Sequence, residues 1–353
     1  MEKEPVINQY LRRMLELGGS DLHLSINFPA KARVHGNIQL LDDDVLDAPR
    51  MEELMKEICL PAWRWTKFME THDLDFAHEI PGLARFRCNY FYNYHGMGCV
   101  LRQIPSRILT MEELHLPKTL EEICNYQSGL VLVTGPTGSG KSTTLAAMID
   151  YINEKLQKHI ITIEDPIEYV HKNIMSLLEQ REVHSDTHSF AAALKYALRE
   201  DPDVILVGEM RDTETIAAAL TAAETGHLVF GTLHTNSAPQ TIDRIIDSFP
   251  SHQQNQIKLQ LASVILGIIS QRLLPTVDGK GRVAAFEILV GTPPVQALVR
   301  EGKTAMLQSL LETGAKDGMI TMQKSLETLY SEGKISLEEM QTYMLDYKAD
   351  DAY

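Results

Sequence analysis

A glycine-rich stretch near the middle of the chain has the residue types that bind the phosphates of a nucleoside triphosphate. It matches the pattern G-x-x-x-x-G-K-[ST] in full. In such a loop the backbone N–H groups surround the phosphates, the lysine reaches the β- and γ-phosphates, and the next hydroxyl ligates Mg²⁺. The loop consists of Gly135, Pro136, Thr137, Gly138, Ser139, Gly140, Lys141, Ser142 and Thr143. We therefore predict that a nucleoside triphosphate binds here, with Lys141 on the phosphates and Ser142 on Mg²⁺.

An acidic residue follows a second apolar stretch. Residues 204–207 read Val-Ile-Leu-Val, and Gly208 and Glu209 come directly after them. Phosphoryl transfer to water needs a carboxylate that orients or deprotonates the water, and a strand-end acid also helps to hold Mg²⁺. The usual motif has aspartate where Gly208 stands, so other acids would have to contribute to the metal site. The alternative is an acid that caps a helix; with the phosphate loop upstream we favour the catalytic interpretation of Glu209.

Three further carboxylates lie within five residues after the apolar segment 161–163. They are Glu164, Asp165 and Glu168. Like charges crowded at a strand end are costly unless a cation compensates them, and Mg²⁺ is such a cation. We predict that Glu164 and Glu168 support the metal and the water, with Ser142, Glu164 and Glu209 as metal ligands. Taken alone, the segment fits a solvated acidic turn before Pro166 better.

Histidines and arginines supply the remaining candidates. His227 and His234 stand at the two ends of a predicted strand, where they would sense the γ-phosphate or couple it to a neighbouring subunit. A lone histidine is more often an ordinary polar residue, and a zinc site is disfavoured because the strand separates the two side chains.

A planar guanidinium suits a γ-phosphate that another domain or subunit presents. The candidates for this role are Arg85, Arg87 and Arg102, and the alternative for them is a surface charge stripe.

The elements that position these residues divide the chain in two. A length of 353 residues favours two domains. Residues 1–104 read as a small α+β domain, 105–119 as a linker, and 120–353 as an α/β domain in which strands and helices alternate around a parallel-rich sheet. Ligands of such sheets bind outside the carboxyl ends of the strands, where the acidic motifs lie. We predict strands in the second domain at 130–133, 160–163, 204–207, 228–233 and 283–289, helices at 141–156 and over most of 294–347, and a single helical segment at 51–69 in the first domain.

Composition limits the function classes. The net charge of −15 disfavours a nucleic-acid motor, which needs a basic footprint for phosphate backbones. The cysteines have no zinc spacing, and their expected state is reduced and structural, as in the cytosol. The N-terminus lacks the apolar core of a signal peptide. The most apolar stretch, residues 259–274, is too short to span a bilayer and contains Gln260, Gln271 and Arg272, so membrane contact is expected only through partners.

Taken together, these motifs resemble the secretion-type ATPases, and within them the PilT-type retraction ATPases of type IV pili. The similarity covers nearly the whole chain. The motifs that carry it are Gly18–Leu24, Arg85–Arg87, the phosphate loop, the "Asp box" Ile163–Glu168, Gln180–Val183, Arg199–Asp203, Gly208–Asp212 and the "His box" Thr221–His234.

The resemblance implies a PAS-like N-terminal domain joined to a RecA-like ATPase domain, assembled as a homo-hexamer with ATP at domain and subunit junctions. Glu209 would be the Walker B glutamate, and the small-domain arginines would approach the phosphates. The implied function is a cytoplasmic motor at the inner-membrane base of the pilus machine. It would hydrolyse ATP with Mg²⁺ to power pilus retraction and twitching motility. Its expected partners are an inner-membrane platform protein and, as a second candidate, a paralogous retraction ATPase.

One segment departs from the family pattern. Retraction motors carry Ala-Ile-Arg-Asn-Leu-Ile-Arg-Glu near the C-terminus, whereas residues 294–301 here read Pro-Val-Gln-Ala-Leu-Val-Arg-Glu. This keeps open a PilU-like auxiliary, or a nucleotide-dependent ring that needs a partner motor. An assembly or secretion ATPase ranks lower, because such enzymes carry an extra N-terminal domain and a four-cysteine zinc site. A RecA-like nucleic-acid motor is disfavoured by the acidic charge.

Overall fold

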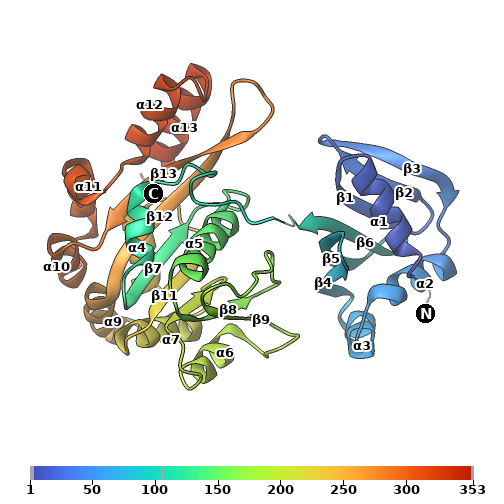
Figure 1. Ribbon diagram of the computed structural model, residues 1–353, viewed down its shortest axis with the longest axis horizontal. Helices are drawn as coiled ribbons and strands as arrows, with labels where there is room; N and C mark the ends of the chain where they lie inside the picture. Colours follow the sequence, from blue (N-terminus) through green and yellow to red (C-terminus); the bar gives the residue numbers. More distant parts are fainter. Residues whose placement is uncertain (1–3, 105–106, 351–353) are drawn as a thin grey trace. The chain divides into compact units, whose positions relative to one another are not determined.

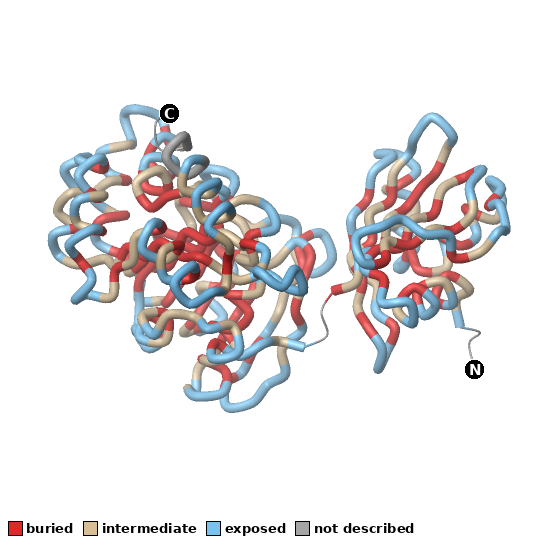
Figure 2. Tube along the Cα trace, turned by 90° about the horizontal axis from the view of Figure 1, so that it is seen from above, coloured by how far each residue is buried: buried red, intermediate tan, exposed pale blue. Residues whose placement is uncertain are grey.

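The computed structural model describes residues 4–104 and 107–350, with the side chains of 346–350 excepted. The chain divides into two compact units, residues 1–107 and 108–353 (Figure 1). In each unit the buried residues follow the strands and the helix faces that cover them (Figure 2). Among the described helices, none is long and apolar enough to cross a membrane.

The first unit is an antiparallel sheet with helices packed on one face. Its sheet has the order β3-β2-β1-β6-β5-β4. Side chains alternate across the sheet, so that Leu22, Phe86 and Leu101 join the core while Asp21, Arg87 and Arg102 lie on the opposite face. Its elements are α1 (Ile7–Glu16), β1 (Gly19–Ser25), β2 (Pro29–Val34), β3 (Asn37–Val45), α2 (Ala48–Ile58), α3 (Ala62–Thr71), β4 (Asp73–Ile80), β5 (Ala84–Asn93) and β6 (Gly96–Ile104).

The single helix predicted over residues 51–69 is wrong. The structure has two helices, α2 and α3, with Pro61 between them as the N-cap residue of α3. Proline has no N–H to continue a helix, and its ring disfavours the helical conformation of the preceding residue. The break was missed because both helices have the same apolar periodicity, so that together they read as one helix.

The second unit is built on a seven-stranded sheet with the order β13-β12-β7-β11-β10-β8-β9. All neighbours run parallel except β12 and β13, and this mixed, mostly parallel sheet confirms the predicted fold class. Helices α6–α9 pack on one face and α4 and α5 on the other, and alternate strand residues enter the two cores. The elements around the sheet begin with α4 (Lys118–Cys124), β7 (Gly129–Thr134), α5 (Lys141–Lys155), β8 (His159–Glu164), β9 (Leu177–Glu182), α6 (Phe190–Ala197), β10 (Val204–Val207), α7 (Thr213–Glu224), β11 (Leu228–Leu233), α8 (Ala238–Asp247), α9 (Ser251–Val264), β12 (Ile265–Pro275) and β13 (Arg282–Val290). They continue with α10 (Pro293–Glu301), α11 (Leu307–Thr313), α12 (Met322–Ser331), α13 (Leu337–Asp350) and two short 3-10 helices, Thr304–Met306 and Gly314–Asp317.

Two strands of this sheet were not predicted. The apolar stretch 259–274 changes from helix to strand at Ile265, and its second half is β12, which pairs with β7 directly beside the phosphate loop. A continuous apolar run has no period that separates a buried strand from a buried helix. The other missed strand, β9, is a polar edge strand beside β8.

Candidate active site

The phosphate loop connects the carboxyl end of β7 to the amino end of the fifteen-residue helix α5. Gly135, Gly138 and Gly140 have φ values of +138°, +79° and +89°, which residues with a side chain rarely adopt. A Cβ on Gly135 would also lie 2.3 Å from the backbone oxygen of Gln271. The loop therefore needs glycine here, and it presents the N–H groups and positive end of α5 to an anion.

Lys141 lies at the centre of this site. Its Nζ donates hydrogen bonds to the backbone oxygens of Gly135 at 2.8 Å and Pro136 at 3.0 Å. Burial lowers the pKa of Lys141, while the negative charges of Glu209 and Glu168 act in the opposite direction. The structure thus brings the loop lysine near both carboxylates.

The side chains present suit a phosphate group. The hydroxyl of Ser139 is buried within the loop and has no hydrogen-bond partner among the described residues. The Lys141 ammonium and this hydroxyl are both donors, and the oxygens of a bound phosphate are acceptors. The buried, unsatisfied donor is costly by itself, so a phosphate that accepts from it would remove that cost.

Glu209 follows β10 at the same edge of the sheet. Its Oε1 lies 3.0 Å from Nε2 of His234, at the carboxyl end of β11, and also accepts a hydrogen bond from Nε of Arg211. Gly208 stands where the usual motif has aspartate, and a Cβ there would lie 3.1 Å from the backbone oxygen of Ile163 and 3.2 Å from Cα of Glu164. The close approach of β8 therefore leaves little room for a side chain.

Glu164 ends β8, and several donors hold its carboxylate. Oε1 accepts hydrogen bonds from the Thr162 hydroxyl at 2.7 Å and the Gln180 amide at 3.1 Å. Burial raises the pKa of Glu164, and these bonds together with the backbone N–H of Glu168 oppose that shift. The carboxylate is therefore oriented by its neighbours.

The described residues include no group of three or more His, Cys, Asp or Glu side chains placed to hold a metal ion. Mg²⁺ usually keeps several waters and takes only one or two protein ligands beside substrate phosphates. Ser142, exposed in the first turn of α5, fits that pattern. The metal assignments of Ser142, Glu164 and Glu209 remain predictions.

The structure does not bring His227 to this edge. His227 precedes β11 at its amino end, where Nδ1 lies 2.9 Å from the backbone oxygen of Ala222. His234 follows the same strand at its carboxyl end. Since a strand rises about 3.3 Å per residue, the two histidines lie roughly 20 Å apart along β11. Of the two histidines, His234 therefore adjoins Glu209 and His227 does not, and their roles in sensing the γ-phosphate or coupling it to a neighbouring subunit stay predictions.

The three candidate arginines lie in the first unit, on the open face of its sheet. Arg87 faces Arg102 across β5 and β6, and Arg102 faces Asp21 across β6 and β1. Nε of Arg102 donates to Asp21 Oδ1 at 2.6 Å, and Arg87 pairs with Asp75 at 3.7 Å. Arg85 shares the strand face of Arg87 because it stands two residues earlier. The arginines thus form one cluster on the sheet surface.

Sequence reasoning missed the residues that support the loop from β12. Gln271 accepts a hydrogen bond from Thr144 of α5 at 2.8 Å, and the hydroxyls of Ser270 and Thr134 lie 2.9 Å apart. All four side chains are buried. The only signal in the sequence was a pair of polar residues, Ser270 and Gln271, within an apolar run.

Comparison with known proteins identifies the family. The model of the type II/IV secretion system protein family matches residues 2–342. The chain belongs to this family. The type IV pilus retraction ATPase PilT of Pseudomonas aeruginosa is 50% identical over 334 residues, which cover 94% of this chain and 96% of that protein.

Two further relatives extend the comparison within the secretion system family. The ATPase PilU of the same organism is 42% identical over 329 residues, covering 93% of this chain and 86% of PilU. A crystal structure of the pilus retraction motor PilT with bound ADP superposes with a TM-score of 0.87 at 47% identity, covering 96% of each chain. The predicted family is therefore confirmed.

Proposed function

We propose that this ATPase powers type IV pilus retraction by hydrolysing ATP with Mg²⁺ in a ring of six identical subunits. The observation that carries the proposal is the convergence of the phosphate loop, Lys141, Glu209 and Glu168 at one edge of the sheet. The relation to PilT supports the same function.

In this proposal the loop amides and Lys141 hold the phosphates, and Ser142 ligates Mg²⁺. When bound, Mg²⁺ neutralises charge on the phosphate oxygens. Glu209 orients the attacking water and accepts its proton. The contacts from His234 and Arg211 hold the Glu209 carboxylate until the water arrives.

Glu164 and Glu168 would support the metal and the water from the Asp box. The resemblance to the family adds Arg85, Arg87 and Arg102, which would approach the phosphates of a nucleotide in the same or a neighbouring subunit. Two of these guanidinium groups already bind carboxylates, Arg87 at Asp75 and Arg102 at Asp21. His227 fits a role toward a neighbouring subunit better than one at its own phosphate, because it lies at the far end of β11.

The assembly proposed is a homo-hexamer in the cytoplasm, at the inner-membrane base of the pilus machine. A platform protein in the inner membrane would receive the motion of the ring and would mediate any contact with the membrane. A paralogous retraction ATPase is a second partner. Nucleic acid is not a proposed partner, because the chain carries a net charge of −15.

Steady-state ATP hydrolysis tests the chemistry. Glu209→Gln should lower kcat by about 100-fold or more, because general-base catalysis contributes on the order of 10²–10⁴. Glu214→Gln, an exposed acid in the first turn of α7, is the matched control and should leave kcat unchanged. Normal hydrolysis by Glu209→Gln, or by Lys141→Ala, would show that the site is assigned wrongly. Loss of pilus retraction in cells that carry Glu209→Gln tests the mechanical role.

A second candidate function is an auxiliary ring that assists a separate retraction motor. It is favoured by residues 294–301 of α10, where Gln296 and Ala297 replace the Arg-Asn of retraction motors. Complementation separates the two functions: a motor restores retraction in cells that lack all paralogues, whereas an auxiliary does so only when the partner motor is present.

A further inference from the structure

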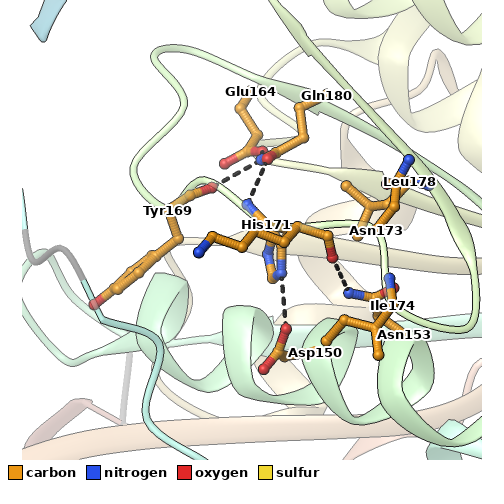
Figure 3. Close-up of polar contacts among 10 residues, drawn as sticks. Asp150, Asn153, Glu164, Tyr169, His171, Asn173, Ile174, Leu178 and Gln180 are labelled. Atoms are coloured by element: carbon orange, nitrogen blue, oxygen red, sulfur yellow. Dashed lines mark hydrogen bonds and ion pairs between the residues drawn. The ribbon is translucent and has the colours of Figure 1, made fainter. Parts of the chain in front are cut away.

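Gln180 connects two strands and a loop of the second unit (Figure 3): its own strand β9, the neighbouring strand β8, and the loop that follows β8. It lies on β9, beside β8, and its side chain uses both the donors and the acceptor of its amide. Nε2 donates to Glu164 Oε1 at 3.1 Å and to the backbone oxygen of Tyr169 at 2.8 Å. Oε1 accepts from the backbone N–H of His171 at 2.8 Å. One side chain thus joins the Asp-box acid to the loop that follows it.

The same loop is attached to the phosphate-binding helix. The hydroxyl of Tyr169 lies 2.9 Å from that of Thr143, which directly follows Ser142. Nδ1 of His171 lies 3.4 Å from Oδ1 of Asp150, two helical turns further along α5. These contacts place the loop along one side of α5 (Figure 3).

A third attachment lies one turn beyond Asp150. Nδ2 of Asn153 donates to the backbone oxygen of Lys172 at 2.6 Å, and Oδ1 of Asn153 accepts from the N–H of Ile174 at 3.2 Å. Asn153 is fully buried, so both bonds are shielded from water. A side chain that is bonded at both polar atoms has few other positions, so Asn153 attaches the loop to α5.

We propose that Gln180 is a positioning residue for Glu164, and that it makes the place of this carboxylate depend on the place of helix α5. The chain of contacts runs from α5 through Tyr169 and His171 to Gln180 and then to Glu164. The inference rests on the proposed role of Glu164 at the metal and the water. It gives the Gln180–Val183 motif a function, because Gln180 connects nucleotide binding at α5 to the acid at the end of β8.

Gln180→Met tests the inference in the full chain. Methionine keeps the length of the side chain and removes both N–H donors. We expect kcat for ATP hydrolysis to fall about 10- to 100-fold, as is typical when an outer residue that orients a metal-site ligand is removed. The affinity for ADP should change less than about 3-fold, since Lys141 and the loop amides are untouched. Gln260→Met is the matched control, because Gln260 also donates to a carboxylate, Glu224, at 3.0 Å, but on the protein surface.

The double variant Glu164→Gln/Gln180→Met distinguishes positioning from a general structural effect. If Gln180 acts through Glu164, the double variant should have the kcat of Glu164→Gln alone. Effects that multiply, or a normal kcat in Gln180→Met, would overturn the inference. If Glu164→Gln itself has normal kcat, the proposed role of Glu164 fails instead. Gln180→Leu, which also removes both N–H donors and adds no charge, gives the same comparison if the methionine variant does not fold by circular dichroism.

Discussion

Replacing Gln271 with leucine is expected to destabilise the second unit through a buried hydrogen bond. Oε1 of Gln271 accepts from the Thr144 hydroxyl at 2.8 Å, and the two residues are 3% and 2% exposed. Gln271→Leu leaves the hydroxyl without its acceptor, and Thr144→Val leaves the amide oxygen without its donor. Each single variant should therefore lose about 1–3 kcal/mol in the free energy of unfolding.

The double variant Thr144→Val/Gln271→Leu measures the coupling energy between the two side chains. Both polar partners are then replaced by apolar groups of similar shape, which can be nearly neutral. The loss in the double variant should be smaller than the sum of the single losses by at least about 1 kcal/mol, whereas independent sites add to within about 0.5 kcal/mol. Additive losses would refute the assignment of this bond as the link between β12 and α5.

Urea unfolding measures these energies, and the sequence supplies an internal control. Both tryptophans, Trp63 and Trp65, lie in the first unit, so their fluorescence reports only that unit. Far-UV circular dichroism reports both units. The variants should move the dichroism transition of the second unit and leave the fluorescence transition in place. A shift of the fluorescence transition would contradict an effect confined to the second unit.

Three further outcomes are expected. Gly135→Ala should weaken ADP binding at least about 100-fold in a nucleotide titration, because the new Cβ would lie 2.3 Å from the backbone oxygen of Gln271 and would force the loop to shift. Gly279→Ala, also at positive φ but with nothing within 4 Å, should bind ADP normally. Burial lowers the pKa of His78 to about 4, so the folded protein binds a proton at this side chain less well than the unfolded chain does. The free energy of unfolding of the first unit should therefore fall by up to about 2 kcal/mol between pH 7 and pH 5, as measured by tryptophan fluorescence. His78→Asn should reduce that fall. Burial raises the pKa of the Cys59 thiol to about 11. A thiol reagent at pH 8 should therefore modify Cys59 only after denaturation. Rapid labelling of Cys59 in the native protein would contradict its burial.

Features encoded by neighbouring residues were predictable from the sequence. The phosphate loop is one contiguous segment, and its glycines, Lys141 and the flanking strand and helix are all specified within about thirty residues of a strand–loop–helix unit. The strand that ends before Glu209 was predictable because its apolar run is short and is bounded by polar residues. Parallel strands with acids at their carboxyl ends then place those acids at one edge of the sheet.

The order of the strands and the contacts between them were decided only by the tertiary structure. Nothing in a continuous apolar run marks where α9 ends and β12 begins at Ile265. The bond between Thr144 and Gln271 joins residues 127 positions apart, and it exists because β12 pairs with β7. Gln180 reaches Glu164 because β9 pairs with β8, and His227 lies away from Glu209 because β11 separates its two ends. Local sequence specifies which groups can bind phosphate, whereas packing among distant segments decides which side chains hold those groups in place.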